Sequence, residues 1–182
     1  MRLIMQAPAL PVNEAARIAT LRDLLILDTA ADAKYDGLTA YACAQFDVPI
    51  AMVSLVDANR QWFKSRCGLD ASESGRDIGF CAHAILGDDL LVINDAAADE
   101  RFADNPLVTG APHIRFYAGC PLKMADGHNI GTFCLIDRRP RHLDDWEAQH
   151  LRDLAWVTAL EIQGIDVIEK WHRNRVEYSQ AG

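Results

Sequence analysis

The stretch Pro49–Gly68, PIAMVSLVDANRQWFKSRCG, predicts a β-hairpin. An apolar run is followed by the polar turn Asp57–Arg60 and then by a second run that contains Trp62 and Phe63. Two short strand-forming runs joined by a polar turn pair as antiparallel strands. This hairpin indicates that the chain builds an antiparallel sheet.

A second hairpin pattern lies nearer the C-terminus. The runs RFYAGCPLKM and IGTFCLID flank the turn ADGHN within residues 115–137. The stretch LLVIND, residues 90–95, predicts one further strand. Residues 96–113, between this strand and the second hairpin, form a long loop. A loop of this length inside a compact domain is usually functional or a lid.

Two amphipathic helices are expected before the first hairpin. The first begins at Asn13, which is suited to cap a helix N-terminus, and places Ile18, Leu21 and Leu25 on one side. The second begins at Asp32 and ends before Pro49, with an apolar face formed by Tyr35, Leu38, Ala42 and Phe46.

Two more helices are expected after the first hairpin. One covers residues 76–86. The last begins at Asp144, and Glu147 three residues later completes a capping-box pattern. Helices around one antiparallel sheet place the chain in the α+β class.

Length and charge narrow the possible functions. The chain has 182 residues, half of them hydrophobic, which suits one domain with a real core. Its net charge of −8 excludes nucleic acid as a general partner, because phosphate binding needs a basic face. The N-terminal residues do not resemble a signal peptide, and no stretch is apolar enough to span a membrane. We therefore expect a cytoplasmic protein.

The cysteines indicate neither a disulfide framework nor a metal site. There are five, an odd number, and they are widely spaced: Cys43, Cys67, Cys81, Cys120 and Cys134. No two have the spacing usual for zinc ligands. Reduced and mostly buried thiols are expected, with no required cofactor.

The stretch RDIGFCAHAI, residues 76–85, is the candidate for chemistry. In a helix, Cys81 falls on an apolar stripe while Phe80 and His83 project roughly opposite, so Cys81 and His83 cannot converge on a metal. Asp77 as N-cap would bring Cys81 near the first turn, where a helix dipole favours a thiolate, so a reactive thiol stays open. Backbone N–H groups beside Arg76 would form an anion-binding corner.

Four blocks of sequence resemble the signature blocks of GAF domains. They are VPIAMVSLVDANRQWFKSRCGL, GRDIGFCAHAIL, INDAAADERFADNPLVTGAPHIRFYAGCPL and GTFCLIDRRPRHL, in the order the family has them. They are similar to the bacterial subfamily found in sensor histidine kinases and diguanylate cyclases. The resemblance covers residues 13–162, which leaves a flexible arm over residues 1–12 and a helical extension over residues 163–182.

The resemblance implies a fold and a pocket. The fold is a central antiparallel sheet of five or six strands, with the N- and C-terminal helices on one face and a helix, loops and a ligand pocket on the other. Nine candidate ligand-binding residues follow from the resemblance, and Arg76 is added because of the possible anion-binding corner. The ten residues are Trp62, Arg76, Phe80, Cys81, His83, Asp95, Phe102, Asn105, Arg115 and Tyr117.

Some of these residues have plainer uses. Asp95, Asn105 and Arg115 are equally suited to pin the long loop by hydrogen bonds and an Asp–Arg pair. Trp62 and Phe63 alternate along a strand, so one belongs in the core and the other faces the pocket or solvent.

The resemblance also implies a regulatory role without chemistry of its own. The chain would bind a small cytoplasmic ligand, pair as a homodimer through its terminal helices, and signal to an output domain such as a kinase or a diguanylate cyclase. In this view His83→Ala or Arg115→Ala weakens ligand binding more than Cys81→Ser does.

Two alternatives remain open. One is a dimerisation or protein-interaction module with a degenerate pocket. The other is a thiol-dependent enzyme like the free methionine sulfoxide reductases, using Cys81, Cys120 or Cys134.

Overall fold

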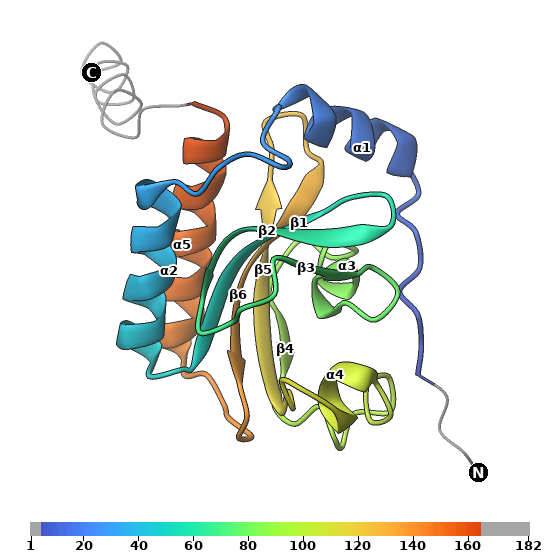
Figure 1. The fold of residues 1–182 in the computed structure, drawn as a ribbon, viewed down its shortest axis with the longest axis vertical. Coiled ribbons are helices and arrows are strands. Elements are labelled where there is room, and N and C mark those ends of the chain that lie inside the picture. Colours follow the sequence, from blue (N-terminus) through green and yellow to red (C-terminus); the bar gives the residue numbers. More distant parts are fainter. Residues whose placement is uncertain (1–4, 165–182) are drawn as a thin grey trace, which may run out of the picture.

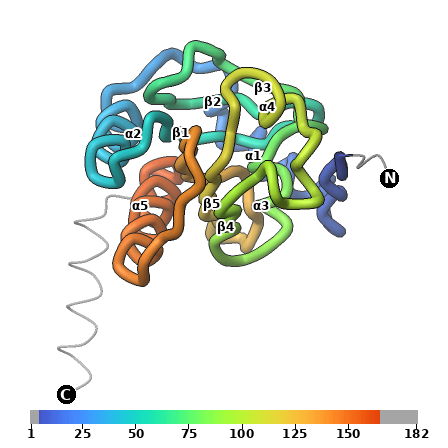
Figure 2. The backbone as a smooth tube through the Cα atoms, turned by 90° about the horizontal axis from the view of Figure 1, so that it is seen from below, coloured from blue at the N-terminus to red at the C-terminus, as the bar shows by residue number. Residues whose placement is uncertain are grey.

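Six antiparallel strands form one sheet in the computed structural model, which describes residues 5–164 (Figures 1 and 2). The strand order is β3-β2-β1-β6-β5-β4. The strands are β1 (Ile50–Val56), β2 (Arg60–Cys67), β3 (Glu73–Gly75), β4 (Leu91–Ile93), β5 (Phe116–Lys123) and β6 (Asn129–Asp137). Both predicted hairpins are present, and the α+β class with a six-stranded sheet is confirmed. The short edge strand β3 was not predicted.

The sheet is covered on both faces, which explains why its central strand reads as a continuous apolar run. Every residue of β1 is buried. Because side chains alternate along a strand, Val53 and Leu55 point into one core, while Ile50 and Met52 point into the other. A strand that is buried on both sides does not alternate apolar and polar residues, so its sequence does not show which side faces which core.

Two long helices form the layer on one face. They are α2 (Ala33–Phe46) and α5 (Asp145–Ile162), which lie side by side against the sheet (Figure 1). Asp32 caps α2 by accepting a hydrogen bond from the Lys34 backbone N–H, and Asp144 and Glu147 form the predicted reciprocal capping box. Both helix starts are therefore as the sequence indicates.

Short elements cover the opposite face. They are α3 (Phe80–Ala84), α4 (Pro106–Thr109) and the segments that connect them. The predicted helix over residues 76–86 is wrong in length, because α3 begins after Gly79 rather than after Asp77. The residues between β3 and α3 are not helical, and the Arg76 N–H donates to the Asn59 carbonyl.

The first helix, α1 (Glu14–Asp23), lies across one end of the sheet rather than flat on a face (Figure 1). It ends earlier than predicted, because Leu25 adopts a left-handed backbone conformation with φ 52° and is exposed. Asn13 precedes the helix without a side-chain cap, and its amide contacts His128 instead. The predicted apolar stripe is therefore reduced, and Arg17 is buried beside Leu21.

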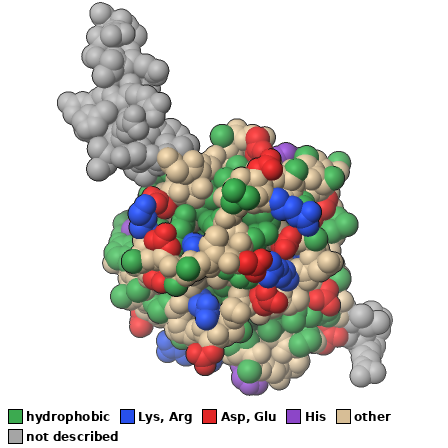
Figure 3. All heavy atoms as spheres, turned by 45° about the horizontal axis from the view of Figure 1, so that its top comes forward, with side chains coloured by type: hydrophobic (Ala, Val, Ile, Leu, Met, Phe, Trp, Pro, Cys, Tyr) green, Lys and Arg blue, Asp and Glu red, His purple; other side chains and the backbone are tan. Residues whose placement is uncertain are grey.

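The surface is mixed in charge. On the face drawn in Figure 3, acidic and basic side chains lie interspersed with hydrophobic ones. Within residues 5–164, none of the helices has the length and apolar character needed to cross a membrane. The predicted helical extension over residues 163–182 lies almost entirely outside the described residues.

Candidate functional site

A cavity of about 410 Å³ lies between the sheet and the segments that carry α3 and α4. The pleat of β1 turns Met52 toward it, and β5 and β6 contribute Tyr117 and Ile136. Most of its walls are apolar or aromatic; those side chains are Met52, Phe63, Leu69, Phe80, Leu107, Pro112, Ile114, Tyr117 and Ile136. Such a cavity can enclose an apolar ligand body.

Polar groups gather at the rim of this cavity. Asp70, Glu73 and Ser74 belong to the segment that joins β2 to β3 or to β3 itself, and Arg138 follows β6. Glu73 is held by Arg60 at 2.8 Å, and Arg138 Nε donates to the Pro112 carbonyl at 3.0 Å. The rim therefore offers charges of both signs around an apolar interior.

Three of the predicted site residues line the cavity: Phe80, Cys81 and Tyr117. Phe80 was predicted to project roughly opposite to Cys81, but both are buried and both line the cavity. The reason is that α3 has only five residues and is enclosed by the sheet on one side and the long loop on the other.

Trp62 lies on the wrong face for the predicted role. It pairs with Leu55 and packs among the helices, whereas Phe63 pairs with Ser54 and lines the cavity. The register of β1 against β2 shifts between Val53 and Ser54, so a bulge offsets the alternation along β2. Trp62 is in the core and Phe63 faces the pocket.

Arg76 and His83 do not line the cavity. Arg76 is buried and donates to Glu14 and to the Asp57 carbonyl, so the predicted anion-binding corner is wrong. His83 Nε2 lies 3.1 Å from the Gln6 carbonyl oxygen, and its ring meets Phe102 edge-on. Burial lowers the pKa of His83, which favours the neutral ring. His83 packs the N-terminal segment against the long loop.

The remaining predicted residues hold the wall behind the cavity. Arg115 donates to both Asp95 carboxylate oxygens, at 2.7 and 2.8 Å. Asn105 caps α4 through the Leu107 N–H and donates to the Ile78 carbonyl at 2.9 Å. Phe102 is fully buried and stacks on Phe80, with ring centroids 4.2 Å apart. Asp95, Asn105 and Arg115 thus make the loop-pinning contacts weighed from sequence.

Sequence reasoning missed most of the cavity lining. Met52 and Ile136 could have been found, because side chains alternate between the two faces of a sheet. Each lies on a predicted strand, and each is on the same face as Tyr117. Leu69 and Ile114 come from irregular segments, and Leu107 comes from the four-residue helix α4, which is too short to show a periodic signal. Their place in the cavity follows from the path of the chain.

Two cysteines meet behind the cavity. Cys81 Sγ lies 3.9 Å from Cys134 Sγ, and both are buried. Cys120, the other cysteine of the second hairpin, pairs with Phe133 and faces the helix layer. Cys120 and Cys134 therefore lie on opposite faces of the sheet.

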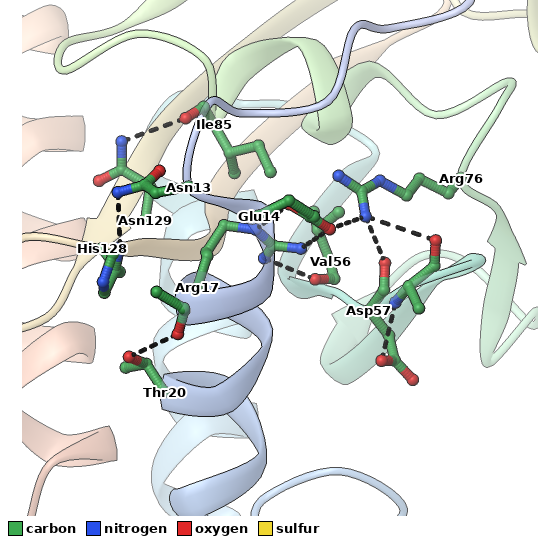
Figure 4. A network of polar contacts seen from close by, with 12 residues as sticks. Asn13, Glu14, Arg17, Thr20, Val56, Asp57, Arg76, Ile85, His128 and Asn129 are labelled. Atoms are coloured by element: carbon green, nitrogen blue, oxygen red, sulfur yellow. Dashed lines mark hydrogen bonds and ion pairs between the residues drawn. The ribbon is translucent and has the colours of Figure 1, made fainter.

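A buried charge network connects the segment before α3 to α1 (Figure 4). Glu14 accepts hydrogen bonds from Arg17 at 2.8 and 2.9 Å and from Arg76. Arg17 also donates to the Val56 carbonyl at 2.7 Å, at the end of β1. One carboxylate thus neutralises part of the charge of two buried guanidinium groups and ties three segments together.

This network predicts an acid-sensitive step in stability. Burial opposes the charged form of Glu14, but the hydrogen bonds from Arg17 and Arg76 outweigh burial and lower its pKa from 4.5 to about 2. A carboxylate with a lowered folded pKa stabilises the fold above its unfolded pKa. The free energy of unfolding should therefore fall as the pH decreases from about 4.5 to about 2.

Urea unfolding of the wild type and of Glu14→Gln across this pH range measures how much Glu14 contributes to the pH dependence of the free energy of unfolding. The difference between the two proteins should be greatest above pH 4.5 and should shrink toward pH 2. A difference that stays constant across the range would contradict the assignment of the low pKa to Glu14.

Comparison with known proteins places this arrangement in a family. The model of the GAF domain matches residues 12–162. A cyclic di-GMP phosphodiesterase from Pseudomonas aeruginosa is 45% identical over 137 residues, which are 75% of this chain and 23% of that protein. The chain therefore spans less than a quarter of the length of this relative.

Solved structures share the fold at low sequence identity. The GAF domain of an Acinetobacter phosphoenolpyruvate-protein phosphotransferase has a TM-score of 0.60 and 14% identity, covering 82% of this chain and 94% of its own. The type II free methionine-R-sulfoxide reductase of Thermoplasma acidophilum also has a TM-score of 0.60 and 14% identity, covering 74% and 94%. At these identities the likeness concerns the fold alone.

Proposed function

Because this chain belongs to the GAF domain family, we propose that it is a sensory module whose cavity binds a small, mainly apolar molecule. The observation that supports this function is the cavity between the sheet and α3. Its volume of about 410 Å³ lies within the roughly 300–1,000 Å³ of small-ligand sites. Its apolar walls and polar rim have the composition of such sites.

The lining suggests the chemistry of the ligand. Phe63, Phe80 and Tyr117 present aromatic surface, which suits a ring or another flat apolar body. Asp70 and Glu73 at one part of the rim disfavour an anionic group there, while Arg138 can accept one. We therefore favour a ligand with an apolar body and a neutral or dipolar end at the rim.

The charge network offers a route from this cavity to the terminal helices. Arg76 lies four residues before Phe80, a wall residue, and is bound to Glu14 in α1. A ligand that shifts α3 would therefore act on the position of α1. We propose that the signal leaves through the terminal helices of a homodimer.

The relative from Pseudomonas aeruginosa supports a signalling context for this module. That protein is named a cyclic di-GMP phosphodiesterase, and the matched residues are a minor part of it. We propose that this chain likewise regulates an output domain, with cyclic di-GMP turnover as the favoured class and a histidine kinase as another. In this proposal the module itself performs no catalysis.

A thermal-shift screen tests the cavity as the binding site. A ligand at 100 times its Kd adds about 2.7 kcal/mol to stability, which raises Tm by a few degrees. The screen covers nucleotides, amino acids and aromatic metabolites, and we expect at least one hit among the last two classes. Ala71→Trp, which places an indole at the rim, should abolish the shift.

Ala98→Trp is the matched control for this experiment. Ala98 is exposed in the turn after β4 and does not line the cavity, so this variant should keep the shift. A shift that persists in Ala71→Trp would place the ligand elsewhere, and a screen without hits would favour the dimerisation module. Consumption of free methionine sulfoxide with a thiol reductant would contradict the sensory proposal and favour an enzyme.

A further inference from the structure

Two cysteines from distant parts of the chain meet behind the cavity, and one of them, Cys81, also lines it. Cys81 belongs to α3 and Cys134 to β6, they are 53 residues apart in sequence, and their sulfur atoms are 3.9 Å apart. We propose that they form a redox-active dithiol, which a hydroperoxide that enters the cavity converts into a disulfide. This proposal does not depend on the sensory ligand.

Three buried hydroxyl groups surround the pair. Ser54 and Thr132 face each other on β1 and β6, two positions along from the pair Met52 and Cys134, and therefore on the same side of the sheet. The hydroxyls of Ser54, Thr132 and Tyr117 are buried, and none of them has a hydrogen-bond partner within the described part of the chain. A buried donor without an acceptor is costly, so this cluster is arranged for an acceptor that the neutral thiols do not supply.

Gly119 allows the phenol of Tyr117 to reach this cluster. Gly119 pairs with Cys134 across β5 and β6, and a Cβ atom at this position would lie 2.1 Å from the Tyr117 hydroxyl oxygen. Any other residue would therefore displace the phenol. The absence of a side chain at Gly119 gives the hydroxyl its place beside the thiols.

The surroundings favour a thiolate on Cys81. Burial opposes it, but the Cys134 thiol and the hydroxyls of Thr132, Tyr117 and Ser54 would become donors to an ionised Cys81, and together they lower its pKa. The hydrogen bond with Cys81, together with burial, raises the pKa of Cys134. Cys81 also lines the cavity, so the ionised sulfur is the one that a small oxidant meets.

These roles define a balanced reaction. The Cys81 thiolate attacks the outer oxygen of the hydroperoxide, the O–O bond breaks, and an alcohol (or water, from hydrogen peroxide) leaves with a proton from solvent. Cys81 is then a sulfenic acid. Cys134 gives up its proton and attacks the Cys81 sulfur, the S–O bond breaks, and water leaves. Two thiols have lost two electrons to one hydroperoxide, and an S–S bond has formed.

The other cysteines are internal controls. Burial and a hydrogen bond with Cys67 raise the pKa of Cys43 to about 12, and burial raises the pKa of Cys120 to about 11. A thiol with a raised pKa is a poor nucleophile at neutral pH, because the thiolate is the reacting form. We therefore expect Cys81 to react before Cys43 and Cys120.

Peptide mapping of the oxidised protein tests the pair. Trypsin cleaves after Arg and Lys, which places Cys81 on the peptide 77–101 and Cys134 on the peptide 124–138. Reduced wild-type protein is treated with hydrogen peroxide at neutral pH, alkylated and digested. We expect these two peptides to be linked, with a mass lower by two hydrogen atoms than their sum. Linkage of other cysteines only, or no linkage, would overturn the proposal.

Variants separate the two steps. Cys134→Ser should stop at the Cys81 sulfenic acid, which a 1,3-dicarbonyl reagent such as dimedone traps, whereas Cys81→Ser should prevent trapping at Cys134. Cys120→Ser should leave the link unchanged. If Cys134→Ser does not fold, the triple variant Cys43→Ser, Cys67→Ser, Cys120→Ser still tests the proposal, because Cys81 and Cys134 are then the two cysteines that remain. In that variant, free thiols by titration should fall from two to none, and retention of both would overturn the proposal.

Discussion

Replacing Glu14 with glutamine is expected to lower the free energy of unfolding by about 3 kcal/mol. Arg17 and Arg76 are 1% and 5% exposed, and Glu14 is the carboxylate that both contact. Its loss would leave two buried guanidinium charges with carbonyl partners alone. Arg76 Nη2 already has no hydrogen-bond partner within residues 5–164, so few other contacts would compensate for the lost carboxylate.

Urea unfolding monitored by circular dichroism measures this loss. Glu161→Gln is the matched control, because Glu161 pairs with Lys34 on the surface, where solvent screens the interaction. The control should leave stability nearly unchanged. Equal effects of the two variants would show that the Glu14 network is no stronger than a surface pair. Because Arg76 precedes the cavity wall, Glu14→Gln should also weaken ligand binding.

Replacing Phe102 with alanine is expected to cost about 3–5 kcal/mol. Phe102 is fully buried, stacks on Phe80, and supports His83 at its edge. Its removal leaves a void behind Phe80, which is a wall of the cavity. Phe102 is therefore a positioning residue, and its loss should weaken ligand binding as well as stability.

Phe102→Leu separates packing volume from aromatic stacking. It retains much of the buried apolar surface, so it should be clearly more stable than Phe102→Ala, while Phe80 still loses its stacked partner. Unfolding in urea gives the stability difference, and the thermal shift of each variant with a screening hit reports the cavity. If Phe102→Ala binds as tightly as the wild type, Phe80 does not depend on Phe102 for its position.

Local patterns in the sequence carried much of the fold. The hairpin of Pro49–Gly68 was predictable because strand-forming runs flank a polar turn, and both are local signals. The start of α5 was predictable because Asp144 and Glu147 satisfy each other's backbone within one turn. The family blocks likewise led to the right sheet and the right side for a pocket.

The details of the site were less accessible. Trp62 and Phe63 were correctly expected to lie on opposite faces, but which face each takes follows from their pairing with Leu55 and Ser54 across the hairpin. The helix over residues 76–86 was too long because helical periodicity reports which faces are apolar and not how far the helix runs. Its start at Gly79 depends on a tertiary contact, since the Gln61 side chain accepts a hydrogen bond from the Ala82 N–H.

Strands, turns, helix caps and the apolar faces of helices depend on residues that are close in the chain, so they could be predicted from the sequence. Which of these elements come into contact depends on the folded chain. Arg76 meets Glu14 from 62 residues away, and Cys81 meets Cys134 from 53 residues away. A charge or a thiol is identified by its letter, but its pKa depends on burial and on neighbours that are distant in the chain. The chemistry of this cavity is therefore a property of the fold.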